Sequence, residues 1–288
     1  MKDFQDKVAL ITGAGNGFGA DFAKEAHRRG MKLMLVDIDE HDVKRTQSAI
    51  LDDRGVAEFC VADVSLESEV DRMVKATLAA FGRIDLLINN AGVAIGGSVV
   101  NMPTRDWEWI VAVNDMSQIY AMKRVIPIMT AQDSPCHIVN VASLAGLVTM
   151  GSMPAYFATK HFSVALTESA NYDLQAKNSK IGMSVFCPGY VQTDLFNYER
   201  HRPERFKAPN DPYYASDAYK EILKMAERVI TTGIPLDPIA ALVFRAIELG
   251  DFYIETNKKA KWLIFDRARN IIFQKNPNYA KVMAKATK

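Results

Sequence analysis

The sequence has few cysteines and no long apolar run. Its 288 residues include three cysteines, Cys60, Cys136 and Cys187, which form neither a CxxC pair nor a zinc-binding spacing. We therefore expect free thiols in a reducing compartment. No stretch of 18 apolar residues occurs, so no membrane-spanning helix is expected. The opening MKDFQDKVALITG lacks the pattern of a signal peptide, and we expect a cytoplasmic protein.

A charge excess of either sign is also lacking. The chain has 35 Lys and Arg against 34 Asp and Glu, a net charge of +1, which argues against a nucleic-acid partner. The balance is uneven along the chain, because residues 256–288 carry nine basic residues and a single acidic one. The remaining residues therefore form an acidic body. The five histidines are dispersed and predict no metal site.

Short apolar runs alternate with longer amphipathic segments. Strands are expected at 8–11, 32–36, 57–62, 84–88, 137–141, 181–186 and 251–254. Helices are expected at 17–29, 40–54, 66–81, 107–129 and 155–176. This alternation predicts a single α/β domain, a Rossmann-type doubly wound parallel sheet of about seven strands with helices on both faces.

Two segments break this rhythm. Residues 194–235 are rich in Pro, Tyr and charge and are too long for a plain connection, which is typical of a lid over a binding site. Residues 256–288 are basic and helical in pattern. We therefore expect a catalytic domain over 1–255, including the lid, followed by a basic helical extension over 256–288.

A glycine-rich turn connects the first strand to the first helix. Its sequence is TGAGNGFG at 12–19, and the candidate phosphate-binding residues in it are Gly13, Gly15, Asn16, Gly17, Phe18 and Gly19. Glycines let the backbone approach a pyrophosphate, and the helix N-terminus offers free N–H groups to the anion. Strand, turn and helix in this order predict a dinucleotide site.

Asp37 ends the second expected strand. In dinucleotide-binding sheets an acidic residue here accepts hydrogen bonds from the adenosine ribose hydroxyls. A carboxylate would repel a 2′-phosphate, and the glycine turn contains no Arg or Lys, so the sequence predicts NAD as the cofactor rather than NADP. Asp37 could also be an ordinary solvated acid at a strand end.

Ser143, Tyr156 and Lys160 form the candidate catalytic group. Ser143 closes the fifth strand, and Tyr156 and Lys160 are spaced to share one helix face. Ligands in open α/β sheets bind at the carboxyl ends of strands. Hydride transfer from an alcohol also requires moving the hydroxyl proton, for which Tyr156 would be the acid or base. The ammonium of Lys160 is expected to lower the pKa of Tyr156, and Ser143 to hold the substrate oxygen.

Together these motifs resemble the short-chain dehydrogenase/reductase family over residues 5–255. They include TGAGNGFG, Asp63 and Val64, the run Asn89-Asn90-Ala91-Gly92, Asn114, the Ser143/Tyr156/Lys160 group and the run Pro188-Gly189-Tyr190-Val191-Gln192-Thr193. One departure is Ser117, where the family often has glycine, and another is the absence of a glycine pair after the last strand.

The resemblance implies further roles for the matching residues. Asp63 and Val64 would contact adenine, and Asn90, with Ala91 and Gly92, would support the cofactor ribose. Asn114 would hold a water that links Lys160 to solvent, and Lys160 would also bind the nicotinamide ribose. Around the nicotinamide, the resemblance places Pro188, Gly189, Val191 and Thr193. The family also implies a homodimer or homotetramer.

Apolar side chains near Ser143 and in the lid suggest a hydrophobic substrate. The candidate contacts are Ser143, Leu144, Met150, Leu195 and Phe196, with Leu147 nearby. A secondary alcohol or ketone of aryl, steroid (hydroxysteroid) or lipid type is expected. The basic lid residues Arg200, Arg202 and Arg205 are interpreted as a solvated face, with recognition of a substrate anion as the alternative.

Other functions stay open at this point. A β-ketoacyl reductase is one, although Asp37 opposes the NADPH that such an enzyme usually uses. A non-catalytic NAD-binding sensor or scaffold is another, although the intact Ser143/Tyr156/Lys160 group argues against it. The basic extension could dock on a sister subunit, which we favour, cover the pocket, or make peripheral contact with an anionic membrane.

Overall fold

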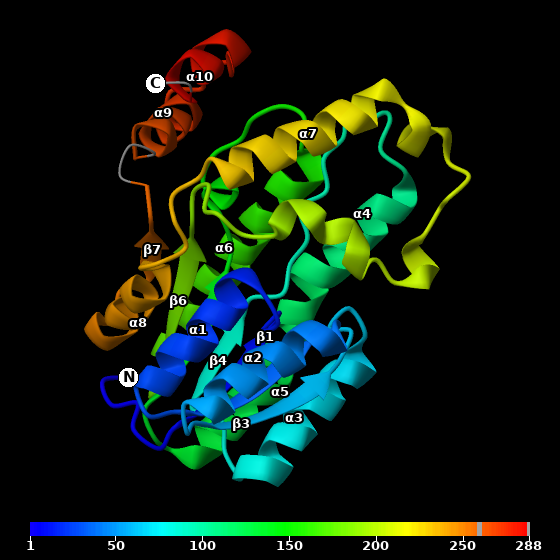
Figure 1. The fold of residues 1–288 in the computed structure, drawn as a ribbon. Helices are drawn as coiled ribbons and strands as arrows, with labels where there is room; N and C mark the ends of the chain where they lie inside the picture. Colours follow the sequence, from blue (N-terminus) through cyan, green and yellow to red (C-terminus); the bar gives the residue numbers. More distant parts are fainter. Residues whose placement is uncertain (258–260, 287–288) are drawn as a thin grey trace.

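The computed structural model of the chain describes residues 1–257 and 261–286. Its centre is one seven-stranded sheet of order β3-β2-β1-β4-β5-β6-β7 in which every pairing is parallel (Figure 1). The strands are β1 (Val8–Thr12), β2 (Lys32–Asp37), β3 (Val56–Val61), β4 (Leu86–Asn89), β5 (Cys136–Val141), β6 (Ile181–Cys187) and β7 (Tyr253–Glu255). The expected Rossmann-type fold is confirmed.

Helices cover both faces of the sheet. The helices are α1 (Gly17–Arg28), α2 (Glu40–Asp52), α3 (Glu67–Phe81), α4 (Thr104–Val111), α5 (Ser117–Gln132), α6 (Pro154–Ala176), α7 (Asp217–Thr231), α8 (Ile239–Leu249), α9 (Lys261–Ile272) and α10 (Tyr279–Ala286). One apolar core joins the sheet to α1, α2 and α8, and a second joins it to α3, α5 and α6. The sequence analysis did not predict α8.

The strands read as continuous apolar runs because both of their faces are buried. In β1, Ala9 and Ile11 belong to the core under α1 and α8, while Leu10 belongs to the core under α3 and α5. Side chains alternate between the two faces of a strand, so both sets must be apolar. β1 therefore contributes to both cores at once.

The centre of the sheet also contains a buried polar connection. Asn89 on β4 donates a hydrogen bond to Asn140 Oδ1 on β5 at 2.8 Å, and Asn140 donates to Thr167 Oγ1 on α6 at 2.9 Å. Buried amides need such partners. This connection ties α6 to the strands in a fixed register.

The expected helix over 107–129 is divided in two. A π-helical turn, Ala112–Met116, separates α4 from α5. Such turns are rare and occur frequently at functional sites. Asn114 lies inside this turn, at a bend that hydrophobic periodicity does not reveal.

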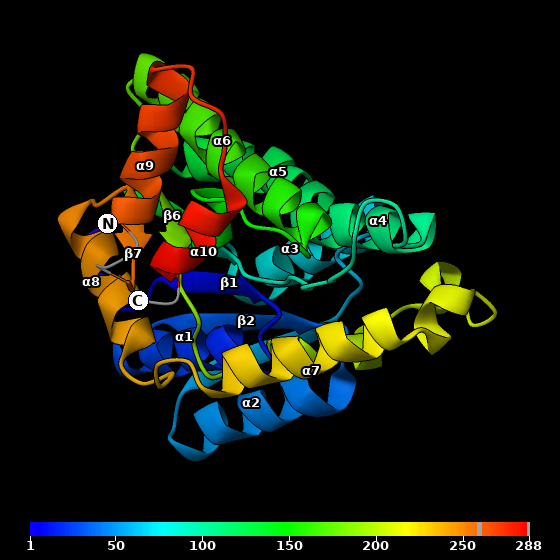
Figure 2. The same ribbon diagram turned by 90° about the horizontal axis from the view of Figure 1, so that it is seen from above.

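The candidate site lies where the strand order reverses. β1 pairs with both β2 and β4, so the chain winds outward from β1 in opposite directions. This arrangement leaves a crevice outside the carboxyl ends of the strands. The segment 194–235 lies over this end as the short 3-10 turns Leu195–His201, Glu204–Phe206 and Pro212–Ala215, followed by α7 (Figures 1 and 2).

The basic extension places α9 beside α6 (Figure 2). Lys258 and Lys259, which belong to the basic set predicted there, lie outside the described residues. Among the residues that the structure describes, no helix is both long and apolar enough to cross a membrane.

Candidate active site

The glycine-rich turn has the close approach that a phosphate cradle requires. Gly13 and Gly17 have φ of +63° and +49°, in the left-handed region that favours glycine. A Cβ on Gly19 would lie 1.9 Å from the carbonyl oxygen of Gly13, so a larger residue there would separate the turn from α1. At the start of α1, the Asn16 side chain accepts the Gly17 N–H at 2.8 Å.

Asp37 lies directly against this turn. Its Oδ2 accepts the Gly15 N–H at 2.8 Å and its Oδ1 accepts the Asp39 N–H at 3.0 Å. Burial raises the pKa of Asp37, and these two backbone N–H groups act in the opposite direction. The carboxyl is thus held at the end of β2, next to the phosphate cradle.

Asn90 holds the turn from the neighbouring strand. Its side-chain amide donates to the carbonyl oxygens of Thr12 at 2.9 Å and Gly13 at 3.0 Å. The backbone N–H groups of Asn90 and Ala91 donate in turn to Thr12 Oγ1 at 3.0 and 3.1 Å. The end of β4 therefore fixes the shape of the glycine turn after β1.

The remaining predicted cofactor residues also gather at the carboxyl edge. Thr193 packs over the glycine turn, because a Cβ on Gly17 would lie 3.4 Å from Thr193 Cβ. Gly189 N–H donates to Thr256 Oγ1 at 3.0 Å. Pro188 is buried and its carbonyl accepts the Leu144 N–H at 2.8 Å. The Val191 side chain is buried in the core between the sheet, α1 and α8.

Asp63 and Val64 follow β3 at the same edge. Val64 is buried, and Asp63 accepts hydrogen bonds from the Ser65 N–H and hydroxyl at 3.1 and 2.5 Å. Arg205 also pairs with Asp63 at 2.6 Å. Both residues lie at the carboxyl edge of the sheet, with a salt bridge to residue 205 that the sequence does not reveal.

Ser143, Tyr156 and Lys160 come together as expected. Ser143 follows β5, and its hydroxyl accepts the Ala145 N–H at 3.1 Å and forms a hydrogen bond with Tyr156. Tyr156 and Lys160 project from the start of α6, with the Lys160 ammonium 5.6 Å from the Tyr156 ring centroid. Lys160 is buried and donates to the Val141 carbonyl at 3.0 Å.

The expected lowering of the Tyr156 pKa is wrong for the structure described. Burial raises the pKa of Tyr156 to about 12, and the hydrogen bond to Ser143 only partly opposes this. The Lys160 ammonium donates its hydrogen bond to the Val141 carbonyl rather than to the Tyr156 phenol. The loss of hydration of the phenol therefore decides the direction of its pKa. Burial also lowers the pKa of Lys160 to about 8.

Asn114 serves as a clamp between two elements. Its Oδ1 accepts the Val93 N–H at 2.9 Å, and its amide donates to the Val93 carbonyl at 3.0 Å and to Thr159 Oγ1 at 3.2 Å. The side chain thus fixes the segment after β4 to α6, next to Lys160. These bonds use both amide hydrogens and one lone pair of Oδ1, which leaves one side-chain lone pair free to accept a hydrogen bond.

Asp115, the next residue of the π-helical turn, was not predicted. It is only 6% exposed, and its Oδ1 has no hydrogen-bond partner among the described residues. Burial raises the pKa of Asp115 to about 7, and Lys160 acts in the opposite direction. The sequence signal was an acid next to Asn114 in an otherwise apolar stretch.

The interpretation of Arg200, Arg202 and Arg205 as a solvated face is wrong for Arg202, which is buried, whereas Arg200 and Arg205 lie at the surface in ion pairs. Arg200 pairs with Asp42 at 2.6 Å, Asp194 at 3.1 Å and Asp39 at 3.3 Å. Arg202 is buried and pairs with Asp106 at 2.6 Å, above the ring of Trp109. Carboxylates far away in the sequence take up these charges, so they are not free to bind a substrate anion.

Aromatic side chains fasten the same segment to the body. Tyr198, Tyr213 and Tyr219 are buried, and the Tyr213 hydroxyl donates to the Gly96 carbonyl at 3.0 Å. A Cβ on Gly96 would lie 2.2 Å from Ile222 of α7, so the segment fits closely against the loop after β4. The candidate substrate residues Leu144, Met150, Leu195 and Phe196 remain partly exposed at this edge.

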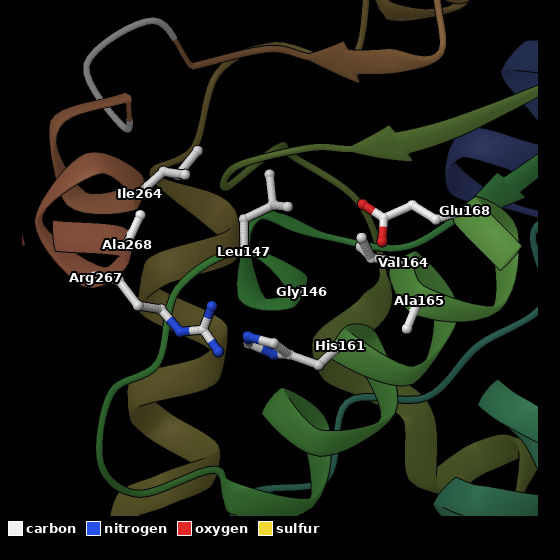
Figure 3. Close-up of a pocket in the computed structure, with 9 residues that line it drawn as sticks. All are labelled: Gly146, Leu147, His161, Val164, Ala165, Glu168, Ile264, Arg267 and Ala268. Carbon is white, nitrogen blue, oxygen red and sulfur yellow. The ribbon is translucent and has the colours of Figure 1, made fainter. Parts of the chain in front are cut away.

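A separate cavity of about 260 Å³ lies between α6 and α9 (Figure 3). Its lining includes Leu147, which had been expected near the substrate, and His161, Glu168 and Arg267. His161 donates its Nδ1–H to the Phe157 carbonyl at 2.8 Å. His161 thus faces the α9 side of α6, while Lys160 donates to Val141 of β5, so the two lie on different sides of the helix as their spacing predicted.

Three potential metal ligands cluster at the start of α2. Asp39, His41 and Asp42 have ligand-type atoms within 4.8 Å of one another. Arg200 and Arg45 already pair with the Asp42 carboxylate, Arg45 at 2.6 Å. The positive charges next to these acids oppose a metal ion there.

Comparison with known proteins identifies the class of this fold and site. The family model for short chain dehydrogenases matches residues 7–204. The chain is 52% identical to the CLA biosynthesis dehydrogenase/reductase of Lactiplantibacillus plantarum, over 96% of this chain and 97% of that protein. The chain therefore belongs to the short-chain dehydrogenase/reductase family of oxidoreductases.

Two further proteins extend the comparison. A short-chain dehydrogenase/reductase from Burkholderia phymatum, solved in complex with NAD, has 36% identity and a TM-score of 0.93, covering 96% of this chain and 98% of its own. Levodione reductase of Leifsonia aquatica is 31% identical over 76% of this chain and 80% of that protein.

Proposed function

We propose that this chain is an NAD-dependent dehydrogenase/reductase that interconverts a hydrophobic secondary alcohol and its ketone. The observation that carries the proposal is the meeting of Ser143, Tyr156 and Lys160 at the carboxyl edge, beside the glycine turn. The relatives support it, since two are named as reductases and a third was solved with NAD.

The residues of the crevice fit NAD. The glycine turn has no side chain in the way of a pyrophosphate, and Asp37 borders it where the adenosine ribose would lie. The oxidised nicotinamide would accept a hydride from the alcohol carbon. Arg45 and Arg200 lie close to this edge, but both are paired with Asp42, which favours NAD over the additional phosphate of NADP.

Tyr156 would carry the proton and Ser143 would position the substrate oxygen. With a pKa raised to about 12, Tyr156 stays protonated near neutrality, which suits donation to a ketone oxygen. In the oxidative direction the proton of the alcohol passes to the phenolate of Tyr156. The buried ammonium of Lys160, 5.6 Å from the Tyr156 ring centroid, would favour that phenolate without offsetting the effect of burial on the pKa of Tyr156.

The same proposal assigns roles to the outer segments. Residues 1–255 would form the catalytic domain, with 194–235 as the lid that shields an aryl, steroid or lipid substrate from water. The extension 256–288 would meet a sister subunit in a homodimer or homotetramer. Trp262 and Phe265 support this, because α9 leaves them 71% and 55% exposed.

The test combines a panel of substrates with a variant that lacks the hydroxyl group of Tyr156. Aryl, steroid and lipid alcohols are supplied with NAD, and formation of NADH is followed by its absorbance. Tyr156→Phe should lower kcat by about 10²–10⁴-fold, because the proton carrier is lost. NAD affinity should change little, and Phe162→Tyr serves as a control on the exposed side of α6. Turnover that survives in Tyr156→Phe would disprove the proposed mechanism.

A further inference from the structure

Asp115 is a buried acid whose negative charge is not balanced by hydrogen bonds. Other buried acids in the described residues have several partners. Asp85, for example, accepts hydrogen bonds from Arg83 at 2.6 and 2.8 Å and from the Val8 N–H at 2.9 Å. Asp115 Oδ1 has none. Burying a carboxylate in this way destabilises a fold, so its presence calls for a reason other than stability.

The position of Asp115 connects it to the reaction centre. It lies in the π-helical turn directly after Asn114, whose side chain is bonded to Val93 and Thr159. A Cβ on Gly92 would lie 3.3 Å from Asn114 Oδ1 and 3.6 Å from Lys160 Nζ, so the turn and the lysine border the same glycine.

The electrostatic relation is between Asp115 and Lys160. Lys160 is the charged group that acts on Asp115. In return Asp115, and to a lesser extent Cys187 of β6, oppose the effect of burial on the ammonium. Both side chains are buried, so bulk water screens the interaction between them less than it would at the surface.

We propose that Asp115 is a positioning residue that acts through Lys160, as the buried counter-charge that keeps the lysine in its ammonium form. This inference rests on the proposed function. During oxidation the hydroxyl proton would move to Tyr156 and the hydride would be taken up by a bound NAD, while Lys160 would keep its proton throughout. Even with Asp115 present, burial lowers the pKa of Lys160 to about 8, so without Asp115 the ammonium would be lost at a lower pH.

The variant Asp115→Asn tests the role of the negative charge, because asparagine has nearly the same size and shape as aspartate. A carboxyl whose folded pKa is raised destabilises the fold only as it ionises, so its cost grows as the pH rises from about 4 toward 7. Asp115→Asn should therefore melt at the same temperature as the native chain at pH 4 and at a higher temperature at pH 7. Its kcat should be within about threefold of native at pH 7 and about tenfold lower at pH 9, from a shift of about one unit in the basic limb.

Ser117→Ala is the matched control. Ser117 begins α5 in the same stretch and donates to the Val113 carbonyl at 2.5 Å, but it carries no charge. It should shift neither the kcat profile nor the pH dependence of melting. A stability gain in Asp115→Asn with an unchanged kcat profile would overturn the role assigned to Asp115.

A second measurement is independent of turnover. In a double-mutant cycle of Asp115→Asn and Lys160→Met, unfolding stabilities at pH 8 should be non-additive, because either single change leaves the other charge buried alone. Additive effects would overturn the proposal. If the coupling is present but no alcohol is oxidised, the proposed function fails while the charge pair stands.

Discussion

At the scale of single residues, the proposed preference for NAD depends on Asp37. Its carboxylate accepts two backbone N–H groups and still has lone pairs for ribose hydroxyls. The neighbouring acids Asp39 and Asp42 have other partners. Asp39 accepts the Asp42 N–H at 3.1 Å to cap α2, and Asp42 pairs with Arg45 and Arg200.

Asp37→Ala should relax the preference for NAD. The change removes an acceptor for the ribose hydroxyls and a charge that repels a 2′-phosphate, and a hydrogen bond to a charged group contributes about 1.5–3 kcal/mol. The ratio of kcat/KM for NAD over NADP should fall by about tenfold or more. Glu40→Ala, which removes an exposed carboxylate nearby, should leave the ratio as it is. An unchanged ratio in Asp37→Ala would show that another residue sets the preference.

At the scale of elements, the segment 194–235, which we propose as the lid, is attached to the body at separate places along its length. Arg200 connects its 3-10 turns to the start of α2 through Asp42, and Arg205 connects them to the carboxyl end of β3 through Asp63. Arg202 connects it to α4 through Asp106, which is 0% exposed. The first two contacts are partly solvated and contribute little each, whereas the third is desolvated and more costly to break.

Arg202→Met should loosen the lid. The change leaves Asp106 buried without its ionic partner, which typically costs about 3–5 kcal/mol. We expect earlier proteolysis within 194–216 and a higher KM for the substrate, with NAD affinity less affected. Arg105→Met removes an exposed arginine on α4 that pairs with Glu108 at 3.3 Å, and it should have little effect. Equal resistance to protease in both variants would contradict this account of the lid.

At the scale of the whole molecule, the charges are separated. Residues 256–288 carry nine Lys and Arg and one acid, while the rest of the chain is net negative. α9 places its own inner side against α6 and leaves apolar and basic side chains outward, Trp262, Phe265 and Arg269 among them. A sister subunit with an acidic body would be the complementary surface.

Reversing the positive charge of the extension 256–288 should weaken the association between subunits. Arg269→Glu combined with Lys275→Glu should shift the chain toward smaller species in sedimentation at low salt, and added salt should have the same effect on the native chain. Lys24→Glu, on the exposed side of α1, is the control for a change of charge alone. Binding of the native chain to anionic vesicles, with unchanged sedimentation of the variant, would favour a membrane surface instead.

The sequence by itself determined the sheet and the positions of the main motifs. Apolar runs such as Val8–Thr12 must be buried on both faces, and the glycine turn and Asp37 follow such strands directly. The local sequence pattern is sufficient to place these residues, because parallel strands bring the residues that follow them to the carboxyl edge of the sheet. The same reasoning placed Ser143, Tyr156 and Lys160 together.

Only the tertiary structure decided how these groups are charged and paired. Arg202 and Asp106 are distant in the sequence, so their pairing depends on how the lid packs on α4. The raised pKa of Tyr156 and the unpartnered oxygen of Asp115 follow from burial. Burial depends on contacts among several elements at once, and the spacing of residues along the chain contains no measure of it.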